Sequence, residues 1–183
     1  MKNKKIVKAV LYGFSTILLV AVGYVCYMYF FIYNKHEVDK KKYPHTVEYI
    51  NPDKAFLNTG FKVCNEKFIV QYYNPERARY SKGKNGLRQF ILSNYKNKNY
   101  SDSGYLNFRF IINCNGEAGR YIIHENDLNL NPKKFNKDLV GQLFNLTTKL
   151  KKWNPNFTQN EFRDSYMYIS YRIENGEIIE ILP

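Results

Sequence analysis

The chain has 183 residues, with 28 Lys and Arg against 16 Asp and Glu, a net charge of +12, three His and three Cys. This length suits one domain with a hydrophobic core. The three histidines are scattered without metal-ligand spacing, and the sequence has no glycine-rich phosphate loop and no nucleophile elbow. The pattern therefore argues against an enzyme, and we expect no catalytic residue, no metal and no cofactor.

The first predicted element is a membrane-spanning helix over residues 9–33, AVLYGFSTILLVAVGYVCYMYFFIY, a stretch without a charged residue. At about 1.5 Å per residue it is longer than the roughly 30 Å hydrocarbon core, so some tilt is expected. A cleaved signal peptide is the alternative. Its apolar region is typically about 7 to 15 residues and ends at a small-x-small site, which this sequence lacks. An uncleaved anchor is favoured, with Cys26 as a thiol inside it.

The lysines that flank this helix do not set its orientation, because four lie on each side. Residues 1–8 form a short tail and about 150 residues follow, which is the ordinary layout of a signal anchor. We therefore predict a single-pass inner-membrane protein with a cytoplasmic N-terminus and a periplasmic C-terminal domain.

The exported part carries 24 of the 28 basic residues and all 16 acidic ones, a net charge of +8. This charge is diffuse along the sequence, and neither an RNA-binding nor a helix-turn-helix signature accompanies it. We expect no nucleic-acid partner. Attraction to an anionic membrane or envelope surface stays open.

Residues 34–60 are polar, contain Pro44 and Pro52 and lack a sustained period, which predicts a tether. Residues 61–73, FKVCNEKFIVQYY, read as strand-like around a Cys-Asn-Glu turn. Apolar residues at helical spacing then predict a short helix that opens near Asn85.

A β-hairpin follows. Residues 105–113, YLNFRFIIN, alternate apolar and polar side chains, as in a strand with one buried face. Asn115 and Gly116 form the predicted turn, and residues 120–124 form the second strand.

The next predicted element is an amphipathic helix with Asn131 as its cap and Pro132 at its first position. Its apolar face consists of Phe135, Leu139, Leu143, Leu146 and Leu150. Residues 165–173, SYMYISYRI, alternate again and predict a strand. The dipeptide Asn175-Gly176 predicts a tight hairpin turn into a last strand, EIIEIL.

Two cysteines, Cys64 and Cys114, lie in the exported part, so a disulfide between them has one possible connectivity. Closing about fifty residues contributes roughly 4 kcal/mol in the loop-entropy model. No nearby histidine or helix terminus marks Cys114 as a reactive thiol. We expect a structural bond.

The order of these elements resembles the TonB C-terminal domain family of cell-envelope proteins over residues 84–173. The resemblance rests on the hairpin with Gly116 in its turn, the apolar helix through Leu150, and Trp153-Asn154-Pro155 before the strand at 165–173. It implies an α+β fold, with an antiparallel sheet packed against one main helix in a two-layer α/β domain over residues 61–183. Gly116, Trp153 and Pro155, together with Asn175 and Gly176, are the expected fold-determining residues.

The resemblance also implies a function. In that family the periplasmic domain has no catalytic residues and binds outer-membrane receptors by pairing an extended receptor segment with an exposed strand edge. Carried over, the pairing strand is 165–173. Its outward side chains, Tyr166, Tyr168, Ser170 and Arg172, are the predicted partner-binding residues.

Several features depart from the family. The tether is not a proline-rich spacer, the anchor has no histidine for a proton-driven motor, and the cysteine pair is foreign to it. A strand after Asn175-Gly176 would also cover one edge of the pairing strand. Two other functions stay open: a divergent paralogue with a structural envelope role, and a binder of envelope glycans or lipid headgroups through tyrosines and basic residues.

Overall fold

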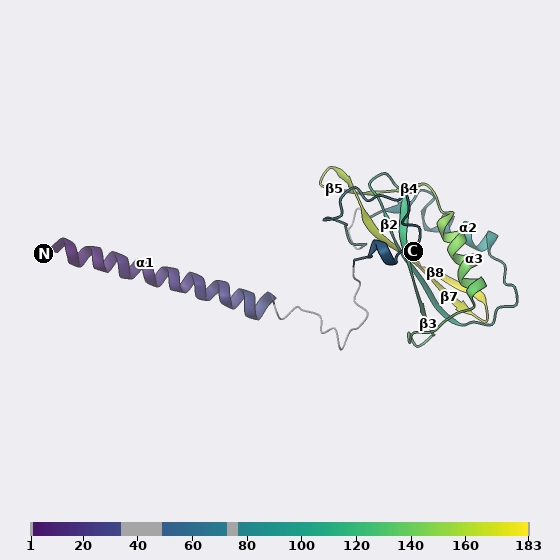
Figure 1. The fold of residues 1–183 in the computed structure, drawn as a ribbon, viewed down its shortest axis with the longest axis horizontal. Coiled ribbons are helices and arrows are strands. Elements are labelled where there is room, and N and C mark those ends of the chain that lie inside the picture. Colours follow the sequence, from purple (N-terminus) through teal and green to yellow (C-terminus); the bar gives the residue numbers. More distant parts are fainter. Residues whose placement is uncertain (1, 34–48, 73–76, 183) are drawn as a thin grey trace. The chain divides into compact units, whose positions relative to one another are not determined.

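The computed structural model describes residues 2–33, 49–72 and 77–182 of the chain (Figure 1). The chain divides into two compact units, Met1–Glu48 and Tyr49–Pro183. Most of the predicted tether, residues 34–48, lies outside the described residues.

The described residues of the first unit form one long helix. The α-helix α1 (Lys2–Tyr27) is continued by a π-helical stretch, η1 (Met28–Tyr33). Its stretch Ile6–Phe31 is long and apolar enough to cross a membrane, judged by length and composition alone. The apolar run predicted from the sequence is therefore helical.

The second unit is an α+β domain. A short 3-10 helix, η3 (Pro52–Lys54), precedes its regular elements. These are, in chain order, β1 (Arg79–Tyr80), α2 (Gly83–Asn94), β2 (Gly104–Ile112), β3 (Ala118–Asn126), α3 (Lys137–Thr148), β4 (Trp153–Asn154), β5 (Asn156–Thr158), β6 (Glu161–Arg163), β7 (Ser165–Glu174) and β8 (Glu177–Leu182).

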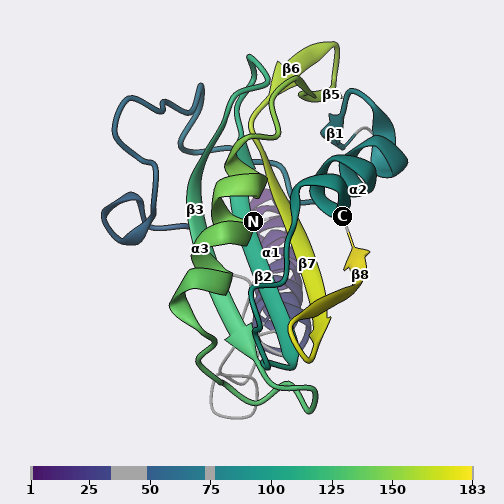
Figure 2. The same cartoon turned by 90° about the vertical axis from the view of Figure 1, so that its right-hand side faces the viewer.

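The main sheet has four antiparallel strands in the order β3-β2-β7-β8. In Figure 2, β3 and β8 lie at the two borders of the sheet, and α2 and α3 lie on one of its faces. Alternate residues of β2 and β7 face these helices, as their period of two requires. Phe108 and Phe110 of β2 and Ile169 and Tyr171 of β7 are fully buried there. The predicted inner face of both strands is confirmed.

The predicted start of the amphipathic helix is wrong. The helix α3 begins at Lys137, and the side chain of Asn136 accepts hydrogen bonds from the backbone N–H groups of Asp138 and Leu139, at 2.8 and 3.4 Å. Pro132 instead forms an antiparallel bridge with Asn126 at the end of β3. An asparagine close to the apolar periodicity thus caps the helix better than one five residues earlier.

Residues 49–72 cover part of the opposite face of the sheet. Ile50 is buried there against Ile111 and Tyr166, so the twelve residues 49–60, predicted as tether, belong to the folded domain. The strand predicted at 61–73 is also wrong for the described residues, which form only one isolated bridge, Val70 with Ser165. This bridge, the Cys64–Cys114 bond and side-chain packing, rather than a ladder, hold the segment on the sheet.

Candidate functional site

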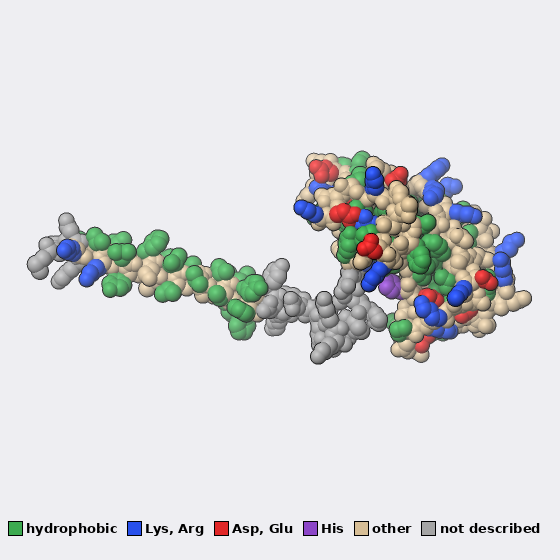
Figure 3. All heavy atoms as spheres, viewed as in Figure 1, with side chains coloured by type: hydrophobic (Ala, Val, Ile, Leu, Met, Phe, Trp, Pro, Cys, Tyr) green, Lys and Arg blue, Asp and Glu red, His purple; other side chains and the backbone are tan. Residues whose placement is uncertain are grey.

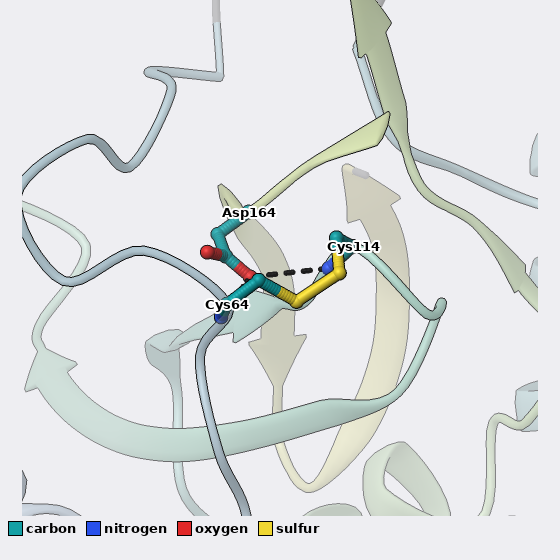
Figure 4. A group of neighbouring side chains, drawn as sticks. All are labelled: Cys64, Cys114 and Asp164. Atoms are coloured by element: carbon teal, nitrogen blue, oxygen red, sulfur yellow. Dashed lines mark hydrogen bonds between the residues drawn. A yellow bond between two sulfur atoms is a disulfide. The ribbon is translucent and has the colours of Figure 1, made fainter. Parts of the chain in front are cut away.

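The predicted disulfide is present. Cys64 and Cys114 are joined by an S–S bond of 2.02 Å, and their Cα atoms lie 6.1 Å apart. The carboxylate of buried Asp164 lies against this bond and accepts hydrogen bonds from the backbone N–H groups of both cysteines, at 3.0 and 3.1 Å, and from Asn65 (Figure 4). One carboxylate thus joins three segments that are distant in sequence, and the bond has a structural environment.

The same three residues are the one group of metal-ligand type found among the described residues, with ligand atoms within 4.8 Å of one another. In the disulfide state they do not suit a metal ion. Metal-binding cysteine is a thiolate, whereas these sulfur atoms are bonded to each other, and both carboxylate oxygens already accept backbone N–H groups. Only reduction would free the sulfur ligands.

Three of the predicted fold-determining residues come together at the β2–β3 turn. Gly116 has φ +78° and packs against the backbone of Trp153, so that a Cβ at this position would lie 2.4 Å from the Trp153 carbonyl oxygen and 3.6 Å from Pro155. The Trp153 indole N–H donates to the Leu150 carbonyl, and its ring contacts Phe110. The hairpin and the chain after α3 therefore fit together only with a glycine in this turn.

The β7–β8 hairpin is also present. Asn175 (φ +50°) and Gly176 (φ +76°) form its two-residue turn, the left-handed pair that such hairpins favour. The Gly176 N–H donates to the Asp102 carbonyl and its own carbonyl accepts from the Tyr95 hydroxyl. This turn sets the position of β8 beside β7.

The pairing role inferred for residues 165–173 does not fit the observed sheet. The strand β7 is paired with β2 from Ser165 to Ile173 and with β8 from Ser170 to Glu174. At the other end of β7 the backbone N–H of Tyr166 donates to the carbonyl of Val70. An added strand needs unpaired main-chain groups at an edge, and β7 is an interior strand. It is interior because β8, the strand expected after Asn175-Gly176, covers its edge.

The four predicted partner-binding side chains share the sheet face opposite the helices, but they differ in exposure. Tyr166 is buried beneath residues 49–72, and the Arg109 guanidinium lies 4.2 Å from its ring centroid. Burial raises the pKa of Tyr166 and lowers that of Arg109. Tyr168, Ser170 and Arg172 are half-buried. Of the four, only these three are accessible enough to contact a partner through their side chains, and that role stays a prediction.

The border of the sheet at β3 is closed along much of its length. Tyr121 exchanges two main-chain hydrogen bonds with Phe56, at 2.8 and 2.9 Å. Further along, the Glu125 carbonyl accepts from the N–H of Lys133. Segments around Phe56 and Lys133 of the same chain thus occupy the edge of β3 where a partner strand would bind.

The border at β8 is different. The N–H of Tyr166 donates to the carbonyl of Val70, on the side of β7 that faces away from β2. Because main-chain groups point to alternate sides along a strand, those of Ser170 and Arg172 lie on the same side and point toward β8. Their partners Leu182 and Glu180 point back at β7, so Ile181 between them points its N–H and C=O outward. Among the described residues, no element outside the β7–β8 pair forms a main-chain hydrogen bond with β8.

Its sequence makes this border suited to pairing. The strand reads EIIEIL, which has high β-propensity and contains neither lysine nor proline, the residues that commonly protect edges. Ile179 and Leu182 keep 51% and 45% of their surface exposed. We call the outer border of Glu177–Leu182 the β8 edge. Sequence reasoning found the strand, but assigned it only the role of covering β7.

Comparison with known proteins found no match: no family model fits the sequence, and neither a curated protein nor a solved structure resembles the chain.

Proposed function

We propose that the chain is a membrane-anchored protein-interaction module that binds an extended segment of a partner protein at the β8 edge. The observation that carries the proposal is the contrast between the two borders of the sheet. The β3 border is occupied by residues of the same chain, whereas the β8 edge has outward main-chain groups beside two exposed apolar side chains. Such an edge is a template for strand addition.

The energetics of this edge indicate what the partner must supply. The strand β8 has a register shift opposite Arg172 and Ile173, after which Ile178 faces Ile173 and, like Ile181, points its main chain outward. These two residues offer about four outward hydrogen bonds, each worth about 1 kcal/mol net. Their sum is of the same size as the entropic cost of association. Side-chain contacts must supply the remainder, and we expect the partner segment to place apolar residues on Ile179 and Leu182.

The resemblance to the TonB C-terminal domain family supports this class of function. A hairpin, a helix and a strand follow one another at β2, β3, α3 and β7, and β2, β3 and β7 share one antiparallel sheet. We extend the proposal to an envelope protein, such as an outer-membrane receptor, as the partner, and to energy coupling or transport across the outer membrane as the process. In this chain the pairing site moves from β7 to β8, because β8 covers the edge that β7 would otherwise offer.

We place the domain in the periplasm, with α1 in the inner membrane and the N-terminus in the cytoplasm. The Cys64–Cys114 bond supports an oxidising compartment, since disulfides persist outside the cytosol and are rare within it. A helix of membrane-spanning length at the start of the chain supports the anchor. The module would act by binding, without catalysis.

Site-specific photocrosslinking in intact cells tests the proposal. A photoreactive residue at Ile179 or Leu182 should capture a discrete partner, whereas the same residue at Leu92 of α2, which is similarly exposed, should not. Equal capture at the three positions, or capture at Leu92 alone, would reject the β8 edge as the site.

A pair of substitutions separates strand pairing from side-chain contact. Ile181→Pro removes an outward N–H while the β7-facing groups of Glu180 and Leu182 remain, and Ile181→Ala removes only packing. Capture should be lost with proline and retained with alanine. Retention with both would show that the partner is not bound through the main chain.

A further inference from the structure

Basic side chains gather at one end of the domain. Five Lys and Arg lie within residues 77–88 and three more within residues 149–152, and all eight are exposed. Neither segment contains an Asp or Glu. Residues 77–88 and 149–152 together are called the basic surface below.

The fold brings these two segments together although about sixty residues separate them. The strands β1 and β4 pair through Arg79 with Asn154 and Tyr80 with Trp153. The N–H of Ser81 donates to the carbonyl of Lys152 at 3.0 Å, and the rings of Tyr80 and Trp153 pack edge to face. The positive charge that is diffuse along the sequence is therefore concentrated by main-chain hydrogen bonds and a buried aromatic contact.

This charge is not neutralised within the described part of the domain. The four ion pairs recorded there involve Arg120, Lys134, Arg163 and Arg172, and none involves a residue of the basic surface. In Figure 3, Lys and Arg side chains project on the side of the domain where Figure 1 places α2 and the end of α3. Like charges held together without counter-charges form a site for an anionic partner.

An aromatic hairpin adjoins the basic surface. The strand β5 starts two residues after β4 ends and pairs with β6, so that Phe157 and Phe162 face each other with ring centroids 5.1 Å apart. The two rings keep 43% and 61% of their surface exposed. Phe68, also exposed, lies under the Arg163 guanidinium at 4.9 Å from its centroid. Exposed aromatic rings beside cations are the combination found on surfaces that insert into a lipid interface.

We propose that this end of the domain docks on anionic lipid headgroups. The lysines and arginines would contact headgroup phosphates, and Phe157 and Phe162 would enter the interfacial layer. The site is separate from the β8 edge and does not depend on strand pairing. It depends on the placement of α1 in a membrane, which keeps a bilayer within reach.

The length of the connecting segment supports a lipid partner. The fifteen residues 34–48 span at most about 50 Å when extended, and a domain of this size has a diameter of about 35 Å. With α1 in a membrane, the start of the domain therefore stays within about 50 Å of the bilayer. Tethering of this kind supplies an effective concentration of the order of millimolar, so weak headgroup contacts suffice. A nucleic acid has no such advantage, because nothing tethers it to the chain.

Lysine acetylation footprinting of the full chain in nanodiscs tests the proposal. Nanodiscs of phosphatidylcholine alone are compared with nanodiscs that contain about one-third phosphatidylglycerol, and the label at each lysine is read by mass spectrometry. Lys82, Lys84, Lys151 and Lys152 should react several-fold more slowly in the anionic nanodiscs, while exposed lysines outside the surface, such as Lys133, should not change. The protection should disappear near 1 M salt, where the screening length falls to about 3 Å.

Charge substitutions give the matched comparison. Lys82→Gln, Lys84→Gln, Lys151→Gln and Lys152→Asn are combined in one variant, with asparagine at 152 because that residue has φ +69°. The control variant changes Lys96, Lys98, Lys133 and Lys137 to Gln, which removes the same charge elsewhere. Each cation removed from the surface should weaken docking about fivefold, so the first variant loses several hundredfold and the control little. Protection of Arg79 and Arg88 against an arginine-specific reagent reports docking in both variants.

The proposal is overturned if the two nanodiscs give the same footprint or if the two variants behave alike. It is also overturned if the surface lysines are protected by a soluble polyanion, such as heparin or an oligonucleotide, but not by the anionic lipid. Loss of photocrosslinking at the β8 edge in the same preparation would concern strand pairing only, because the footprint reports a different set of residues.

Discussion

Removal of the Cys64–Cys114 bond by Cys64→Ala/Cys114→Ala should lower the free energy of unfolding of the domain by about 4 kcal/mol. The bond closes a loop with a sequence separation of 50, and the loop-entropy relation then gives about 14 cal/mol/K, or about 4 kcal/mol near 25 °C. The three N–H bonds to Asp164 survive the substitution and keep the two backbones close. The loss should therefore not exceed the loop term.

The assay is urea unfolding of the full chain in mild detergent, followed by fluorescence. The chain contains a single tryptophan, and Trp153 is buried between β1 and the sheet, so its emission reports the fold of this domain alone. Cys26→Ala serves as the control and should leave the unfolding midpoint unchanged. A loss below about 1 kcal/mol in the double variant would refute the reasoning, because the bond would then not restrict the unfolded chain as the loop-entropy relation requires.

Three further outcomes are expected. Thiol titration of the denatured chain should find one reactive cysteine, Cys26, before reduction and three after it, and three before reduction would contradict the disulfide. Gly176→Ala should cost about 2 kcal/mol or more in urea unfolding, because a Cβ at φ +76° would lie 2.2 Å from the Tyr100 carbonyl oxygen, whereas the helical control Gly141→Ala meets no atom within 4 Å and should be neutral or stabilising. Hydrogen bonds from Arg120 hold the pKa of Glu66 below its ordinary value, so this pair stabilises the domain at neutral pH and the gain is lost as the pH falls through the lowered pKa. Because Glu66 is half-exposed, Glu66→Gln should cost under about 1 kcal/mol at neutral pH and nothing in acid, and an equal cost at both would contradict the assignment.

Elements with a clear period were predictable from the sequence. The alternation in 105–113 and 165–173 reports one buried face directly, and Asn175-Gly176 matches a turn that needs two left-handed residues. The two cysteines were predictable as a pair because only one connectivity exists for them. In each case the residues that determine the structure are visible in the sequence without knowledge of the fold.

The rest depends on contacts between distant segments. Residues 61–73 resemble a strand by composition, yet they bind the sheet through Asp164, which is about a hundred residues away in the sequence. The β1–β4 ladder has two residues on each side, too few for a period, so the basic surface was read as diffuse charge. The β8 edge is available for pairing because no other described segment forms main-chain hydrogen bonds with it. That depends on the whole fold, so the local sequence of β8 does not predict it.

The position of the disulfide also limits how far the domain can stretch. If a partner on β8 is pulled while α1 stays in the membrane, tension runs along the chain from Tyr49 to Leu182. The residues between Cys64 and Cys114 are bypassed by the covalent bond, which removes about 170 Å of chain from the length that could be drawn out. Under the same force, the oxidised domain would therefore extend less than the reduced one before the chain becomes taut. The cysteine pair would set this maximum extension.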